Sequence, residues 1–423
     1  MTFRRLWIGQ LFSNLGTQVC LYALSLWIFR LEGRLQAIAA VLVVVQLAKV
    51  ATMPVISRWL PGWPRRRVMV VCNLLSCSSS LCLAGSLALR GGELPLWAVL
   101  PWLVVAASME AVLGLCLSTM VPLMLPQHRW AAVNGWVAGA EGVVNMASPF
   151  LGALVVIHLG LAGIAGLDAL STGVALICLG GGRWCEAWQA PPDAPDQKPL
   201  VGTRNNLRHF IRWPLTRSLL LMGVTMMATC AAVEVLFPAW ILAAFPTDAL
   251  PRALLISAIT YGAGMIVWRR YGTGHWRFWL VVGLLIQAFV LMAAAWSGFE
   301  QLIPAWLFGV GAFNFAVPIV VAALQTLWMN AVPIQQQLGA FAARHALEWA
   351  ARLFGAAAAA ALVDYLMHPL LNTTVLGQWF GQGVGRAMAL TLALVGLVQL
   401  AVVAFQTPAL IRSSKWAANG SHS

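Results

Sequence analysis

Long apolar runs of about 20 residues, interrupted only by short polar breaks, fill almost the whole chain. A run of that length matches a helix that crosses the hydrocarbon core of a bilayer. Hydrophobic residues make up 61% of the 423 residues and charged residues 9%, which is more apolar surface than a soluble protein could bury. The runs are continuous and do not alternate, which argues against a membrane β-barrel. We therefore predict an all-α membrane protein.

We predict twelve transmembrane helices, with both termini in the cytoplasm. Their approximate limits are 6–29, 36–60, 68–89, 96–125, 131–157, 161–182, 216–244, 252–268, 275–297, 302–330, 344–366 and 386–408. Most Lys and Arg residues then lie in the cytoplasmic connections, as the positive-inside rule requires. The connections on the other side contain only Arg30, Arg34, Arg90, Arg252 and Arg386. This distribution accounts for the net charge of +13 without a nucleic-acid partner.

The longest break, 183–215, divides the chain into two six-helix halves, 1–182 and 216–423. This predicted cytoplasmic linker begins with a proline-rich stretch that cannot form a regular helix and continues with a basic stretch suited to the inner membrane surface. The connections of the two halves also match. LPGWPRRRVMVV corresponds to WRRYGTGHWRFW, and PQHRWAAVNGW corresponds to VPIQQQLGAFAAR. Two such halves are typical of a transporter built from repeats.

Four segments carry a resemblance to a known family. They are FRRLWIGQLFSNLGTQ, GLDALS, QQLGAFAARHALEWAARLFGAAAAAALVDYLMHPLL and GQGVGRAMAL. Together they resemble the major facilitator superfamily, and more closely its drug-efflux branch of macrolide exporters, enterobactin-type siderophore exporters and carriers found beside nonribosomal peptide synthetases. The resemblance implies two pseudo-symmetric six-helix halves, alternating access and a bacterial inner-membrane location. It also implies export of an amphiphilic small molecule, such as a drug, siderophore or peptide-like product, by proton antiport.

The connection between the second and third helices departs from the family pattern. The family usually has Gly, then Asp-Arg, before its basic cluster, whereas Ser57, Pro61 and Gly62 stand at these positions here. What remains of the gating loop is Arg65, Arg66 and Arg67. In the family the loop Asp helps to latch the two halves. Two hypotheses are therefore open: a transporter with altered gating, and a degenerate membrane partner or sensor that does not transport. A lipid flippase on the same fold is a further alternative.

Charged residues near the middle of a membrane helix cost on the order of 3 kcal/mol and usually face a cavity or a partner. Lys49, Glu110 and Glu141 lie near mid-depth in the second, fourth and fifth helices. They are the candidates for proton coupling, because a carboxyl can alternate between a proton and a cationic partner. A permanent structural ion pair is the alternative. Gly114 and Ser118 continue the face of Glu110 and leave open volume or admit another helix.

Other polar residues within the helices predict contacts with a substrate or with a neighbouring helix. A stripe at four-residue spacing on the first helix either lines a water-filled cavity or hydrogen-bonds another helix; it consists of Gln10, Asn14, Gln18 and Tyr22. The remaining candidates for a substrate cavity are Asn145, Glu234, Asn314 and Gln325.

Three further residues are predicted to be structural. Asp168 lies in the outer part of the sixth helix and is expected to hydrogen-bond a neighbouring helix or backbone. Glu348 and Arg352 lie four residues apart with the acid first, which predicts an ion pair within the eleventh helix.

The sequence contains no pattern of an enzyme or a metal site. It has no Gly-Lys-Ser/Thr phosphate loop, and its seven His residues are scattered without paired ligand spacing. We therefore expect no catalytic residue, metal or bound cofactor, and a proton gradient as the energy source. The expected partners are an amphiphilic substrate and the lipid bilayer, with a monomeric chain. Many Trp residues lie at helix ends and predict interfacial belts; they are Trp7, Trp59, Trp63, Trp97, Trp130, Trp276, Trp279 and Trp328.

Overall fold

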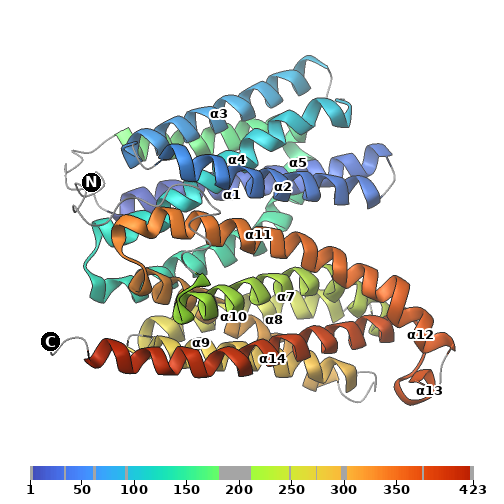
Figure 1. The fold of residues 1–423 in the computed structure, drawn as a ribbon. Helices are drawn as coiled ribbons and strands as arrows, with labels where there is room; N and C mark the ends of the chain where they lie inside the picture. Colours follow the sequence, from blue (N-terminus) through green and yellow to red (C-terminus); the bar gives the residue numbers. More distant parts are fainter. Residues whose placement is uncertain are drawn as a thin grey trace. The chain divides into compact units, whose positions relative to one another are not determined.

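A computed structural model describes most of the chain as helices. The described residues are 3–32, 35–60, 63–90, 94–180, 211–246, 249–272, 274–296, 303–373 and 376–419, and no β-strand occurs among them (Figure 1). Within these ranges, nine helices are long and apolar enough to cross a membrane. The predicted all-α fold is confirmed. The predicted linker, 183–215, lies outside the described residues as far as position 210.

The first half of the chain forms five long helices. Their bounds are Phe3–Glu32 (α1), Leu35–Trp59 (α2), Arg65–Leu89 (α3), Leu96–Met124 (α4) and Trp130–Gly180 (α5). The predicted fifth and sixth helices are the two parts of α5, which meet at Gly160. This glycine has φ 64° and ψ −177°, a left-handed conformation that a residue with a side chain rarely adopts. A single residue therefore separates two membrane-length helices.

The second half begins with α7 and ends with α14. The helices are Pro214–Ala244 (α7), Ala249–Tyr271 (α8), Trp276–Ala293 (α9), Ile303–Ala331 (α10), Gln337–Ala361 (α11), His368–Thr373 (α12), Leu376–Phe380 (α13) and Val384–Asn419 (α14), with a π-helical turn, Leu362–Met367, after α11. The predicted eighth helix, 252–268, was too short. Arg252, Arg269 and Arg270 continue α8 at its two ends, where charged side chains can reach the headgroups.

The chain divides into two compact units. Unit 1 comprises Met1–Trp130, Ala140–Arg208 and Val332–Ala346, and unit 2 comprises Ala131–Gly139, His209–Ala331 and Leu347–Ser423. In unit 1, α4 packs along α2 and α3. In unit 2, α10 packs along α8 and α9, while α14 packs along α7 and α9 (Figure 1). The fourth helix of each repeat thus has equivalent neighbours.

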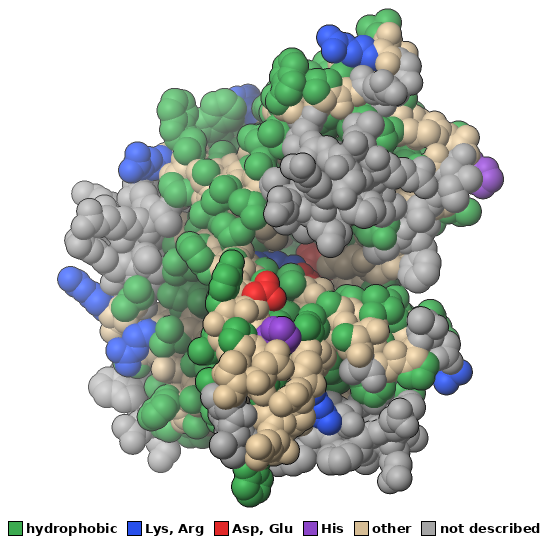
Figure 2. All heavy atoms as spheres, turned by 90° about the vertical axis from the view of Figure 1, so that its right-hand side faces the viewer, with side chains coloured by type: hydrophobic (Ala, Val, Ile, Leu, Met, Phe, Trp, Pro, Cys, Tyr) green, Lys and Arg blue, Asp and Glu red, His purple; other side chains and the backbone are tan. Residues whose placement is uncertain are grey.

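The surface of the described residues is largely apolar, as a lipid-facing protein requires. Figure 2 looks onto the helix ends at the right of Figure 1, where green side chains lie among tan polar and backbone atoms and a few charged side chains. Large exposed hydrophobic residues occur on helices of both units, among them Leu81, Ile177, Ile259 and Phe405. In water such a surface would be unstable, whereas in a bilayer it contacts acyl chains.

The connections before α5 and α11 share one geometry. Pro126 and Pro333 each lead into a short 3₁₀ turn, Gln127–Arg129 and Ile334–Gln336, after a helix of 29 residues. Trp130 Nε1 donates to the carbonyl of Leu125 at 2.9 Å, and Gln337 Nε2 donates to the carbonyl of Val332 at 3.0 Å. The last carbonyls of a helix lack partners in the helix. Two different side chains satisfy them in the same way, which supports the predicted repeat.

The tryptophan belt is only partly as predicted. Trp59, Trp63 and Trp97 are exposed, as residues at a membrane interface should be. Trp130 and Trp328 are buried instead, so their assignment to the belt was wrong. Trp130 is buried because its ring closes the connection before α5.

Candidate functional site

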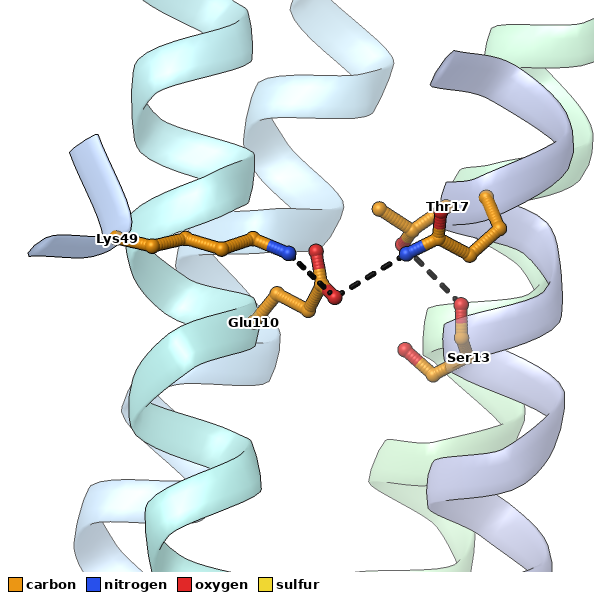
Figure 3. Close-up of polar contacts among 5 residues, drawn as sticks. Ser13, Thr17, Lys49 and Glu110 are labelled. Atoms are coloured by element: carbon orange, nitrogen blue, oxygen red, sulfur yellow. Dashed lines mark hydrogen bonds and ion pairs between the residues drawn. The ribbon is translucent and has the colours of Figure 1, made fainter. Parts of the chain in front are cut away.

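An ion pair between α2 and α4 lies at the centre of the candidate site in unit 1. Lys49 Nζ lies 2.8 Å from Glu110 Oε1, and the two side chains point toward each other (Figure 3). Gln18 Nε2 on α1 donates to the same oxygen at 3.1 Å. The pairing that the sequence predicted for Lys49 is therefore confirmed with Glu110. Three helices meet at one carboxylate oxygen.

Small residues allow α2 and α4 to bring these charges together. Ala48, beside Lys49, and Ala107, one turn before Glu110, are both buried in unit 1. The ion pair itself is less buried, with 12% of the Lys49 side chain and 25% of the Glu110 side chain exposed. An apolar surrounding strengthens the attraction between the charges, and partial exposure leaves the pair accessible to water.

Glu141 and Asn145 lie on an exposed face of α5, in the part that belongs to unit 1. Glu141 is close enough to Glu110 and Lys49 to interact with their charges. The three residues predicted for proton coupling are therefore neighbours. Only Glu110 and Lys49 are in direct contact, so Glu141 remains a candidate that could receive Lys49 after the ion pair opens.

The polar stripe on α1 is not one uniform surface. Gln18 bonds Glu110, while Tyr22 packs on α5, where a Cβ added to Gly152 would lie 3.1 Å from the Tyr22 ring. Within the described residues, Gln10 Nε2 and Asn14 Oδ1 are buried atoms without a hydrogen-bond partner. Buried amide groups normally have partners, so these two are suited to bind a polar group that the chain does not supply.

The face of α4 beyond Glu110 borders open space, as the small residues predicted. Gly114 is exposed, and a Cβ added there would meet no described atom within 4 Å. Ser118 donates to the carbonyl of Gly114 at 2.9 Å, so its hydroxyl folds back onto its own helix. Beside the ion pair, α4 thus leaves room for a bulky group.

Asp168 is buried between helices of unit 1, with 2% of its surface exposed. Thr17 on α1 donates to Oδ1 at 2.9 Å, and Ser80 on α3 donates to Oδ2 at 2.5 Å. Gly16 allows the close approach, because a Cβ there would lie 3.1 Å from Oδ1. The predicted hydrogen bonds from Asp168 to neighbouring helices are confirmed.

The predicted ion pair between Glu348 and Arg352 was wrong. The Arg352 guanidinium lies 2.6 Å from Glu234 Oε2 on α7, whereas Glu348 is buried and its carboxylate lies against Gly223. The reason is that α7 packs beside both side chains. Its Glu234 binds Arg352, and its Gly223 leaves space for the carboxylate of Glu348. Glu234, predicted to face a cavity, is 59% exposed but is engaged by Arg352.

Two further cavity candidates lie on α10 of unit 2. Asn314 Nδ2 donates to Ser257 Oγ on α8 and to the carbonyl of Val310, both at 3.0 Å. Its amide therefore joins α10 to α8. Gln325 is partly buried on the same helix. Neither residue lies in unit 1 with the Lys49 ion pair.

The basic cluster of the gating loop separates into two kinds of residue. Arg65 is buried and donates to the carbonyl of Leu60 at 3.3 Å, so it closes the start of α3. Arg66 and Arg67 are exposed on the first turn of α3. Pro61 and Gly62, where the family pattern is lost, lie outside the described residues.

Unit 2 contains a contact that the sequence analysis missed. The segment Ala131–Gly139 packs on α8 and α10: Trp268 Nε1 donates to the carbonyl of Ala131 at 2.8 Å, and Asn134 Nδ2 donates to Thr326 Oγ1 at 3.0 Å. A Cβ at Gly135 would clash with the Trp268 ring. The signal was present in the sequence, because Gly135 and Gly139 form a GxxxG pattern, which lets helices approach closely.

Metal ligands do not cluster in the described part of the chain, where no group of three His, Cys, Asp or Glu side chains could hold a metal ion. Within the described residues, the site offers one ion pair, Lys49–Glu110, and the buried amide groups of Gln10 and Asn14 for hydrogen bonding.

Comparison with known proteins identifies the family. The model of the Major Facilitator Superfamily matches residues 6–356. Among solved structures, a bacterial homologue of the iron transporter ferroportin in an outward-facing state is 15% identical, with 98% of this chain and 99% of that chain covered and a TM-score of 0.73. The human organic anion transporter MFSD10 (TETRAN) is 14% identical, with 95% and 100% covered and a TM-score of 0.68. No curated protein matches. At these identities the structures show the fold alone.

Proposed function

Because the chain belongs to the Major Facilitator Superfamily, we propose that it is a secondary transporter that exports an amphiphilic small molecule from the cytoplasm in exchange for protons. The family and the fold are those of transporters and not of enzymes. The observation that supports proton exchange is the partly exposed ion pair of Lys49 and Glu110 in the middle of the predicted membrane helices.

Protonation of Glu110 would change every contact in this cluster. In the ionised state its Oε1 accepts hydrogen bonds from Lys49 and from Gln18. A proton on the carboxyl removes the negative charge, so the Lys49 ammonium loses its counter-ion and the Gln18 amide is released from a charged acceptor. Lys49 then requires another anion, and Glu141 is the neighbouring carboxylate. Proton binding at one atom would thus rearrange α1, α2 and α4.

An amphiphilic substrate fits the surroundings of the ion pair. Gln10 and Asn14 offer a donor and an acceptor that have no partner in the described part of the chain, and Glu141 and Asn145 lie on an exposed face of α5. The exposed Val143 adds apolar surface between Glu141 and Asn145, and α4 leaves open space at Gly114. A molecule with polar groups on an apolar frame would use both kinds of surface. Macrolide-like drugs, siderophores and nonribosomal peptides are substrates of this kind.

Transport into inside-out vesicles tests the proposal. A pH gradient is imposed and a panel of amphiphilic compounds is screened for proton-dependent accumulation by the wild type, by Glu110→Gln and by Glu141→Gln. Asp364→Asn is the matched control, since Asp364 is an exposed acid at the outer end of the eleventh helix. We expect Glu110→Gln to lose coupling and Asp364→Asn to retain it.

Three outcomes would contradict the proposal in different ways. Unchanged transport in both Glu110→Gln and Glu141→Gln would exclude these carboxyls from coupling. If folded protein accumulates no compound at all, the chain is a membrane partner or sensor, the hypothesis raised by its altered second connection. Preferential movement of a labelled lysophospholipid would identify a flippase.

A further inference from the structure

We propose that Asp168 is a second proton-carrying carboxyl of unit 1 and exchanges its proton with Glu110 through a small cavity that both residues line. Its contribution to transport rests on the function proposed above. The protonation of Asp168 does not depend on that function and can be measured without a substrate. Four observations support the proposal: the cavity, the absence of a basic partner, a hydroxyl that can serve two states of the acid, and the position of α1.

The cavity lies inside unit 1, between α1, α2, α3, α4 and the second part of α5. Its polar lining comes from Thr17, Ser79, Ser80, Glu110 and Asp168, and the remainder is mostly apolar. Its volume is about 30 Å³, room for about two water molecules. Two waters between polar groups are able to pass a proton from one carboxyl to the other. Because only 2% of Asp168 is exposed, this cavity is the route by which water would reach it.

Asp168 has no cationic partner among the residues that the structure describes. The titratable groups near it on the packed helices are Cys20 on α1, Cys77 on α3 and Glu110 on α4, and none of them is basic. The ammonium of Lys49 is bonded to Glu110. A carboxylate buried in a membrane without a counter-ion is costly. A proton is the smallest cation that removes this cost.

The hydroxyl of Thr17 is placed to serve both protonation states. Its Oγ1 lies 2.9 Å from Asp168 Oδ1 and 3.1 Å from the carbonyl of Ser13 on its own helix. A hydroxyl has one hydrogen, so it can donate to only one of these acceptors at a time. It donates to Asp168 when the acid is ionised. When the acid is protonated, Thr17 donates to Ser13 and accepts the hydrogen of Asp168, and no buried group loses its partner.

Adjacent residues of α1 hold the two carboxyls. Thr17 bonds Asp168 and Gln18 bonds Glu110, at 2.9 and 3.1 Å. A proton that moves between the acids therefore changes the hydrogen bonding of two consecutive side chains on one helix. The hydrogen bonds from Thr17 and Ser80 hold Asp168 in place. A change in the charge of Asp168 would act on α1 and α3 through the same two bonds.

Infrared difference spectroscopy of the purified protein in liposomes tests this proposal. The carbonyl stretch of protonated carboxylic acids is recorded as pH is varied in potassium buffer. We expect the wild type to show a pH-dependent component that is lost in Asp168→Asn, while a separate component is lost in Glu110→Gln. Thr17→Val should shift the frequency and midpoint of the Asp168 component. Ser78→Ala is the matched control, because Ser78 is an exposed hydroxyl on α3 that bonds its own helix.

The proposal is overturned if the pH-difference spectrum of Asp168→Asn equals that of the wild type. If Asp168→Asn does not fold, as judged by size-exclusion chromatography, the decision rests on Thr17→Val. A spectrum of Thr17→Val that equals that of the wild type would then overturn the proposal. Replacing potassium by sodium at constant ionic strength provides a further arm. Loss of the Asp168 component in sodium alone would identify a sodium site instead. Failure of vesicle transport with an intact Asp168 component would reject the proposed function and leave the protonation standing.

Discussion

Replacing Glu110 with Gln should destabilise the protein because it leaves the Lys49 ammonium without its counter-ion. Two unit charges 2.8 Å apart attract each other by about 6 kcal/mol at an effective dielectric constant of about 20. Removing one member of a fully buried pair costs about 3–5 kcal/mol. Since 25% of the Glu110 side chain is exposed and water reaches the pair, we expect a loss of about 2–3 kcal/mol in the free energy of unfolding.

The charge origin of this loss can be separated from packing by a double-mutant cycle. Lys49→Met combined with Glu110→Gln removes both charges, and the double variant should be less destabilised than the sum of the single variants by about 2–3 kcal/mol, because no unpaired charge remains. Equilibrium unfolding in mixed micelles, followed by tryptophan fluorescence, measures all four proteins. Additive losses, or a Glu110→Gln variant as stable as the wild type, would refute the electrostatic explanation.

Three further predictions concern unit 2 and use the same unfolding measurement. Gly264→Ala places a methyl group against the backbone of α10 and should cost about 1–3 kcal/mol, whereas Gly262→Ala on the same helix meets open space and should change stability by less than about 1 kcal/mol; equal losses would contradict the packing. Arg352→Met removes the ion-pair partner of Glu234, but the Glu234 side chain is 59% exposed and its carboxylate can be hydrated. The free energy of unfolding should therefore fall by less than about 1 kcal/mol, and a larger loss would mean that the carboxylate is not hydrated. Trp268→Phe removes one donor to a backbone carbonyl and should cost about 1 kcal/mol, while no loss would show that this hydrogen bond contributes nothing.

Hydropathy predicts most of this fold because a bilayer prescribes the length of every crossing helix. The break between the predicted helices 131–157 and 161–182 was placed correctly at Gly160, although hydropathy does not reveal that a single left-handed residue makes it. The errors fall where other physics decides the boundary. Arg269 and Arg270 mark an apparent end of α8, yet their long side chains allow the helix to continue to Tyr271.

The candidate site was predictable to the extent that charge is rare in a membrane. Lys49 and Glu110 are conspicuous in apolar runs, and two opposite charges at similar depth predict a pair. The hydroxyl partners of Asp168 were not predictable, because Ser and Thr are common in membrane helices and carry no pattern. The partner of Arg352 was predicted wrongly, because spacing along one helix contains no information about the helix packed beside it.

The two hydrogen bonds of α1 also restrict how this helix can move. Consecutive residues of an α-helix point about 100° apart, so Thr17 and Gln18 face different neighbours from one rigid rod. A rotation of about 5° displaces a side-chain tip at a radius of about 5 Å by roughly half an ångström, enough to lengthen a hydrogen bond of 3.1 Å beyond good geometry. A rotation of α1 therefore moves both side chains at once and changes both hydrogen bonds. The hydrogen bonds to Asp168 and Glu110 together favour one rotational position of α1. A change of charge at either acid weakens one of these bonds and therefore favours a different rotation of the helix.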